Sequence, residues 1–184
     1  MRKGLAASAV LVGLLLAGCS GGARETPPTT DASVPTSEST SAQSARSGPA
    51  KSLDLGDRCS IVSESQAKEL GADQQPRERE SNGTPGCNYD LGTSGAGFMV
   101  FVAVDKTETM PQFADARRSS VQMIDIGGYP AAQVGTNKTN CLLSLDVSSQ
   151  GSLYINTLVP SGNQNPCDLS KRFAEAALKN LPNA

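Results

Sequence analysis

The chain has 184 residues, of which 16 are Lys or Arg and 18 are Asp or Glu, giving a formal net charge of −2 at pH 7. This balance lacks the strongly basic character of nucleic-acid-binding proteins, so nucleic acid is not an expected partner. Histidine, the commonest general acid or base of enzymes, is absent from the sequence. A non-catalytic role is therefore expected.

The N-terminus has the features of an export signal. A basic head, Met1-Arg2-Lys3, precedes an apolar run over residues 5–16, and two small residues follow at Ala17-Gly18. An apolar stretch of this length is typical of a secretory signal. It is shorter than the ~20 residues that a membrane-spanning helix needs. Residues 1–18 are therefore predicted to direct export and to be removed.

The tetrapeptide Leu16-Ala17-Gly18-Cys19 resembles the lipobox of bacterial prolipoproteins. Its cysteine thiol can form a thioether to diacylglycerol, and the small residues before it let a signal peptidase reach the backbone. The alternative is an ordinary secretory signal with a chance cysteine. Two acyl chains anchor a protein stably, whereas a single chain is marginal. We therefore expect a lipid anchor on Cys19 that holds the protein on the extracytoplasmic face of the cell membrane.

Lipidation of Cys19 would leave four cysteines, namely Cys59, Cys87, Cys141 and Cys167. An even number in an oxidising compartment predicts two disulfides, with three possible connectivities. We favour Cys59–Cys87 and Cys141–Cys167, because each pair links a strand-like segment to the start of a helix-like one. A zinc site is the alternative, but the sequence has no Cys-x-x-Cys pair and no histidine. No metal or other cofactor is therefore expected.

Residues 20–52 differ in composition from the rest of the chain. Twenty of these 33 residues are Ser, Thr, Pro or Gly, and Val34 is the only apolar residue larger than Ala. Such a segment cannot bury enough apolar surface to offset its ordering entropy. Residues 19–52 are predicted to form a lipidated, disordered tether with a reach of about 30 Å. Residues 53–184 are predicted to form one folded domain.

The folded domain is predicted to begin with a short helix. Ser63 and Gln66 have the spacing of a capping box, and Gly71 is placed to end the helix. Residues 72–86 are polar and interrupted by Gly and Pro, which predicts a loop. A second short helix is expected over residues 110–119.

Apolar runs joined by Gly-containing turns predict three β-hairpins. Their strands cover residues 87–91 and 97–105, residues 121–126 and 129–134, and residues 141–147 and 152–159. A last helix opens at Pro166-Cys167-Asp168, with Asp168 as its N-cap, and Pro182 ends it. This order predicts an α+β domain, in which an antiparallel sheet carries its helices on one face and two disulfides link the elements.

Several of these motifs occur together in a known family. Gly86-Cys87-Asn88-Tyr89, Gly127-Gly128-Tyr129-Pro130-Ala131 and Cys167-Asp168-Leu169 follow a lipobox and a Ser/Thr/Pro tether. The chain thereby resembles the actinobacterial cell-envelope lipoproteins whose domain is catalogued as a domain of unknown function, the mycobacterial Lpr-type lipoproteins among them. Tyr89 departs from the Trp expected after Gly-Cys-x. The resemblance covers about residues 53–181 and implies no catalytic residue.

No group of residues has the pattern of a catalytic or nucleotide-binding site. Ser65 and Lys68 have Ser-x-x-Lys spacing, but they fall within a polar helical stretch and are expected to be solvated. Gly127-Gly128 lacks a phosphate-binding pattern and fits a hairpin turn better. Two pairs of carboxylates are expected to be solvated or to serve turns and strand ends: Glu78 and Glu80, and Asp125 and Asp146.

Two functions from different classes remain open. The first is a non-catalytic, membrane-tethered module that binds another envelope protein or a cell-wall polymer. The second is a carrier of a lipid or other apolar small molecule, held between the sheet and its helices. Five aromatic side chains would line a carrier's cavity and would otherwise fill the core: Phe98, Phe101, Tyr129, Tyr154 and Phe173. An enzyme ranks third, because no set of reactive groups supports it.

Overall fold

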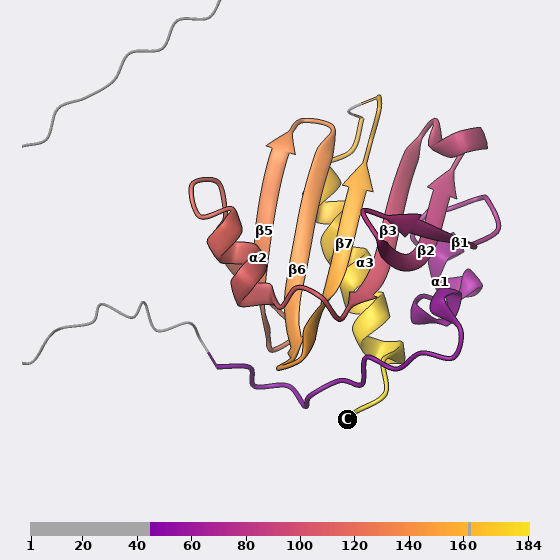
Figure 1. Ribbon diagram of the computed structural model, residues 1–184. Helices are drawn as coiled ribbons and strands as arrows, with labels where there is room; N and C mark the ends of the chain where they lie inside the picture. The colour runs from indigo at the N-terminus through magenta and orange to yellow at the C-terminus, as the bar shows by residue number, and fades with distance from the viewer. Residues whose placement is uncertain (1–44, 162) are drawn as a thin grey trace, which may run out of the picture. The chain divides into compact units, whose positions relative to one another are not determined.

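The computed structural model describes residues 45–161 and 163–184, so the signal, Cys19 and most of the expected tether lie outside the described residues. Seven antiparallel strands form one sheet in the order β1-β2-β3-β7-β6-β5-β4 (Figure 1). The strands are β1 (Arg77–Ser81), β2 (Thr84–Leu91), β3 (Phe98–Asp105), β4 (Gln122–Ile126), β5 (Tyr129–Asn137), β6 (Asn140–Ser148) and β7 (Gly151–Leu158). The helices are η1 (Arg58–Ile61), α1 (Glu64–Glu69), η2 (Thr93–Gly95), α2 (Met110–Ala116) and α3 (Pro166–Asn180).

All three predicted hairpins are present. β2 pairs with β3, β4 with β5, and β6 with β7, each pair antiparallel. The turn between β4 and β5 uses Gly127 and Gly128, whose φ angles are 61° and 87°. Glycine adopts such angles without the steric penalty that a Cβ brings. The Asp125 carboxylate accepts the Gly128 N–H at 2.9 Å, so this aspartate serves the turn, as predicted.

The segment 72–86 is not a loop throughout, because it contains β1 and the start of β2. β1 lies at the end of the sheet, where it pairs with β2, and its side chains alternate arginine and glutamate from Arg77 to Glu80. Four of its five residues are exposed, so it lacks the apolar alternation that identifies a strand in a sequence. Charged side chains on such an edge also oppose pairing with another molecule.

The larger core lies between the sheet and α3, on what we term the α3 face. Leu143 of β6 and Ile155 of β7 are fully buried in it. Phe173 of α3 is also fully buried, and its ring centroid lies 5.5 Å from that of Tyr89 and 6.3 Å from that of Phe98. The η1–α1 segment joins the same cluster through Ile61, Val62 and Ala67. The α3 face is therefore covered by side chains from the first helical segment of the domain, η1–α1, and from its last helix, α3.

α2 packs on the opposite face, which we term the α2 face, so the helices do not all lie on one side as predicted. Met110 and Phe113 of α2 cluster with Ala132 and Val134 of β5. Ala131 belongs to the core under α3, and successive residues of a strand point to opposite faces. Figure 1 shows α2 in front of the sheet and α3 behind it. A seven-residue helix with two fully buried side chains has too little periodicity to reveal which face it will cover.

The cap of α1 is as predicted, and the cap of α3 is not. Ser63 Oγ accepts the Gln66 N–H, and the Gln66 side chain accepts the Ser63 N–H. α3 begins at Pro166 after the N-cap Asn165, whose side chain accepts two N–H groups of the first turn. Asp168 lies inside that turn, where its negative charge interacts favourably with the helix dipole. Proline is favoured at the first helical position, so the helix begins at Pro166 itself. The N-cap therefore lies three residues earlier than predicted.

The folded part begins before residue 53, earlier than composition predicted. The N–H groups of Ser47 and Gly48 donate to the Gly128 carbonyl at 3.0 and 3.1 Å. Arg46 Nη1 lies 2.8 Å from Asp146 Oδ1, so this aspartate pairs with a cation. This part of the expected tether is thus fixed to the domain by backbone hydrogen bonds and an ion pair, which a count of residue types cannot anticipate.

Candidate binding groove

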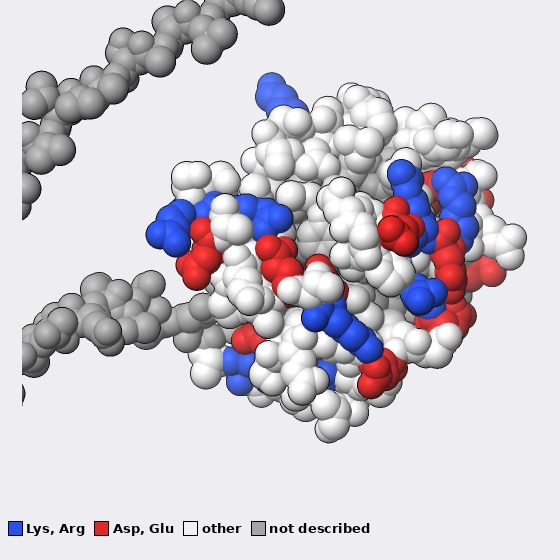
Figure 2. Space-filling model, in the orientation of Figure 1, with Lys and Arg blue, Asp and Glu red and all other residues white. Residues whose placement is uncertain are grey.

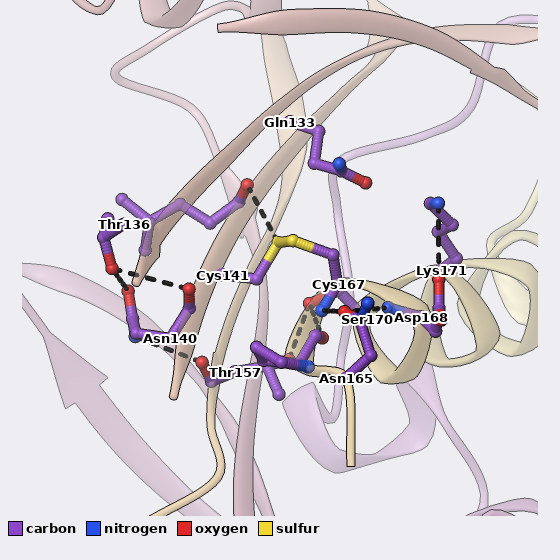
Figure 3. Close-up of a disulfide and its surroundings, with 12 residues drawn as sticks. Gln133, Thr136, Asn140, Cys141, Thr157, Asn165, Cys167, Asp168, Ser170 and Lys171 are labelled. Atoms are coloured by element: carbon purple, nitrogen blue, oxygen red, sulfur yellow. Dashed lines mark hydrogen bonds and ion pairs between the residues drawn. A yellow bond between two sulfur atoms is a disulfide. The ribbon is translucent and has the colours of Figure 1, made fainter. Parts of the chain in front are cut away.

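Both favoured disulfides are present. Cys59–Cys87 ties η1 to β2, with Cα atoms 5.0 Å apart. Cys141–Cys167 ties β6 to the first turn of α3, with Cα atoms 5.1 Å apart. Figure 3 shows the second bridge beside the N-terminus of α3 and its N-cap Asn165. These four cysteines are structural, and as disulfides they are not nucleophiles.

Tyr89 connects the region of the first disulfide to the core. The family resemblance led us to expect Trp at this position. Its hydroxyl donates to the Val62 carbonyl at 3.0 Å and accepts the Val62 N–H at 3.2 Å. Burial raises the pKa of Tyr89, which keeps the hydroxyl protonated. The indole of a Trp is a donor alone, whereas a phenol both donates and accepts. Tyr89 therefore satisfies both backbone groups of Val62 and has a structural role.

The five aromatic residues considered for a carrier's cavity do not gather around one. Phe98 and Phe173 lie in the core of the α3 face. Tyr129 is buried at the start of β5, and its hydroxyl donates to the backbone of the N-terminal segment. Phe101 and Tyr154 lie on the α2 face, with ring centroids 6.4 Å apart. The aromatic rings are thus divided between the two faces of the sheet.

An open groove of about 200 Å³ lies on the α2 face and is built by five strands. Three of its eight lining side chains are asparagine amides, and one is an arginine. We term it the polar groove, and its lining residues are Arg79, Ser81, Asn88, Met99, Phe101, Asn140, Asn156 and Leu158. Figure 2 shows this face as largely uncharged, hollowed surface between charged side chains over α2 and over β1. A neighbouring hollow of about 240 Å³ shares Ser81 and reaches Tyr154 and Arg117.

The strand register places one amide on each side of an aromatic residue in the groove. Asn88 of β2 pairs with Phe101 of β3, and Phe101 pairs with Asn156 of β7. A Cβ on Gly86 would lie 2.6 Å from Phe101 Cζ. The Phe101 ring can therefore pack over β2 because Gly86 has no side chain. Phe101 is 4% exposed and forms the floor of the groove. The next row of paired residues on the same face is Met99, Leu158 and Asn140.

Asn88 belongs to a buried polar chain beneath the groove. It is 1% exposed, its Nδ2 donates to Asp90 Oδ1 at 2.6 Å, and Arg77 Nη2 donates to Asp90 Oδ2 at 2.5 Å. Burial raises the pKa of Asp90, and the charge of Arg77 opposes this shift without cancelling it. Asn88 Oδ1 has no hydrogen-bond partner among the described residues. A buried polar atom left unpaired costs about 1–3 kcal/mol, so a ligand donor here would remove a real penalty.

A second hollow, of about 500 Å³, lies beside the turn between β1 and β2. Leu53, Leu55 and Val104 supply its apolar lining, and Lys106 forms an ion pair with Asp54 at its edge. None of the unpartnered buried side-chain atoms of the described residues belongs to this hollow. No unpaired buried polar atom of the described residues therefore points to a ligand in this hollow.

Other side chains considered for chemistry form surface ion pairs. Lys68 Nζ lies 2.7 Å from Glu64 Oε1 on α1, and Glu78 Oε2 lies 3.1 Å from Arg58 Nη1. No group of three or more His, Cys, Asp or Glu within residues 45–161 and 163–184 could hold a metal ion. No helix in the part of the chain that the structure describes is long and apolar enough to cross a membrane. The polar groove is the candidate site that remains.

The groove was not predicted from the sequence. Its residues come from strands that are distant in the chain, and the pairing of β3 with β7 brings them together. The available signal was a polar residue in the middle of a strand, namely Asn88 in β2 and Asn156 in β7. Neither residue alone distinguishes a binding site from an ordinary polar position in a strand.

A comparison with protein-family models decides the family. The model described as "Protein of unknown function (DUF3558)" matches residues 14–180, which is most of the chain. The chain belongs to the DUF3558 family. The matched range of this DUF3558 protein includes Cys19, both disulfides and every residue of the polar groove. Neither a search of curated proteins nor a search of solved structures returned a match.

Proposed function

We propose that this DUF3558 protein is a membrane-anchored surface lipoprotein that acts as a non-catalytic binding module in the cell envelope. The observation that carries the proposal is the polar groove, a concave patch of convergent amides on part of the sheet face that α2 leaves open. A few placed polar groups in a concavity on a rigid scaffold are the usual features of a binding site. The resemblance to envelope lipoproteins of the Lpr type supports another envelope protein or a cell-wall polymer as the partner.

The alternative function, a carrier of an apolar small molecule, has weaker support. The ring of Phe173 packs against those of Tyr89 and Phe98 where a carrier would hold its ligand. The hollow of about 500 Å³ beside the β1–β2 turn is the feature that favours a carrier, because part of its lining is apolar. A lipid that copurifies with the full-length protein in native mass spectrometry would support the carrier.

Replacing Cys19 by alanine is expected to abolish anchoring. The proposal rests on the tetrapeptide Leu16-Ala17-Gly18-Cys19, since only a thiol can form the thioether to the lipid. Intact-mass measurement of the wild-type protein should show the added acyl groups, and C19A should lack them and leave the membrane fraction. The neighbouring substitution Ser20→Ala is the control and should stay anchored. A C19A protein that keeps a lipid mass would contradict the anchor.

A photo-crosslinking amino acid placed at Leu158 is expected to label a partner, whereas the same amino acid at Met123 is not. Leu158 is 38% exposed in the polar groove, and Met123 is 46% exposed on β4, at the far edge of the sheet. The full-length protein is irradiated in its own cells, and adducts are resolved by mass. An adduct at position 158 alone, either a discrete protein adduct or covalent attachment to the cell-wall polymer, supports the groove as the binding face.

The two positions form a matched pair, because both are exposed apolar side chains on strands. Neither replacement should disturb folding, since exposed substitutions usually change stability by less than about 0.5 kcal/mol. Equal labelling at both positions, or none at position 158, would refute the binding function proposed for the groove.

A further inference from the structure

We propose that the polar groove binds a glycan, a chain of sugar rings that presents hydroxyl groups to the side-chain amides. This inference rests on the proposed binding function and names the class of ligand. It starts from Asn88, which is 1% exposed and lines the groove, and whose Oδ1 has no partner among the described residues. The oxygen is fixed as an acceptor, because Asn88 Nδ2 already donates to Asp90. The ligand must therefore bring an O–H or N–H donor.

The amide on the other side of Phe101 has the opposite requirement. Asn156 Oδ1 accepts the Asn140 Nδ2 hydrogen at 2.9 Å, which orients the Asn156 amide. The structure shows no hydrogen bond from Asn156 Nδ2 to any described residue, so its N–H groups remain as donors. A free acceptor thus lies on one side of the aromatic floor and free donors on the other. A hydroxyl both donates and accepts, so neighbouring hydroxyls on one ring can serve both amides.

The remaining lining of the groove also fits a sugar ring. Leu158 is exposed and Met99 is half-buried, so they offer apolar surface to the C–H groups of such a ring. Arg79 adds a cluster of donors at the β1 side of the groove. The groove of about 200 Å³ and its neighbour of about 240 Å³ share Ser81, so an extended chain can pass from one to the other. Each hollow is smaller than a typical small-molecule pocket, which favours a polymer lying across both.

The position of the groove on the sheet disfavours a peptide. An extended peptide gains most of its affinity by adding a strand to an open sheet edge, where backbone groups are free. Here the groove lies over β3 and β7, whose backbone groups pair with strands on both sides. A helical peptide needs an apolar groove, whereas this one carries three amides and an arginine. A ligand rich in hydroxyl groups matches the lining better.

The test uses glycan strands prepared from peptidoglycan with an amidase that removes the stem peptides. They are added to the full-length protein in detergent micelles, and the side-chain amide signals of Asn88 and Asn156 are followed by NMR. Both signals are expected to shift as the glycan is titrated. Leu158→Arg is expected to weaken binding at least tenfold by filling the groove, whereas the matched control Met123→Arg should bind as the wild type does.

Asn88→Ala is expected to weaken binding about tenfold, the effect of one buried hydrogen bond. This variant also removes a donor from Asp90, so its thermal unfolding is measured alongside. If it does not fold, Leu158→Arg decides the question, because that position is exposed.

Two results would overturn the glycan assignment: no shift of either amide at millimolar glycan, or unchanged affinity of Leu158→Arg. Free stem peptide that shifts the same amides in place of the glycan would also overturn it and would leave the binding function standing. The proposed binding function is refuted only by the crosslinking comparison of positions 158 and 123. A wrong glycan assignment can therefore be distinguished from a wrong binding function.

Discussion

Replacing Phe173 by alanine is expected to lower the free energy of unfolding by about 4 kcal/mol, the usual loss for a buried phenylalanine that leaves a cavity. Phe173 is fully buried in the core of the α3 face, in contact with the rings of Tyr89 and Phe98. The sheet under it is fixed by hydrogen bonds on both sides of each inner strand, so the cavity cannot easily close. Urea unfolding measures the loss, followed by circular dichroism because the sequence has no Trp.

The control is Met123→Ala, which removes a large apolar side chain that is 46% exposed. It should change the free energy of unfolding by less than about 0.5 kcal/mol. A loss below about 2 kcal/mol for Phe173→Ala would mean that the core refills the space, contrary to the packing described. Equal losses for the two variants would show that burial does not control stability at these positions.

The predictions that held were local in the chain. β3 was expected over residues 97–105 and covers Phe98–Asp105, since a continuous run of β-branched and aromatic residues bounded by turns needs no distant information. The turn at Gly127-Gly128 and the cap at Ser63 depend likewise on residues a few positions apart. Such features can be predicted because the interactions that stabilise them lie within one short segment.

The predictions that failed depended on partners distant in the chain. β1 is a strand because β2 pairs with it, not because its own charged residues prefer extended structure. Residues 46–52 are ordered through bonds to the β4–β5 turn and to β6, more than 70 positions away. The face that α2 covers depends on how Met110 and Phe113 meet β5. Composition and periodicity contain none of this information.

The groove illustrates the same limit for function. Asn88 and Asn156 carry no motif, and each alone resembles a chance polar residue in a strand. They become a site only because β3 lies between β2 and β7 and places Phe101 between them. The cysteines were the exception among distant residues. The expectation of an oxidising compartment, with an even number of cysteines once Cys19 is set aside, restricted the pairing to three connectivities before any fold was known.

Removing the Cys141–Cys167 disulfide is expected to lower the free energy of unfolding by about 3.5 kcal/mol. The bridge closes a loop with a sequence separation of 26, and the chain-entropy model gives this value for such a loop. α3 should remain in place in Cys141→Ala/Cys167→Ala, because Ser170 Oγ still donates to Thr157 Oγ1 at 2.7 Å in a buried contact. The loss therefore arises mainly from a freer unfolded chain. Urea unfolding of the double variant measures it.

Cys59→Ala/Cys87→Ala is the matched comparison, since its sequence separation of 28 is nearly the same. The chain-entropy model predicts nearly equal losses, whereas local strain or lost packing would make them differ. The Tyr89 hydroxyl should keep the η1 region attached to the core in this variant. Replacing all four cysteines should then cost about 7 kcal/mol, which lies within the 5–15 kcal/mol that holds a typical domain folded. A loss below about 1 kcal/mol for either pair would contradict the role given to that bridge.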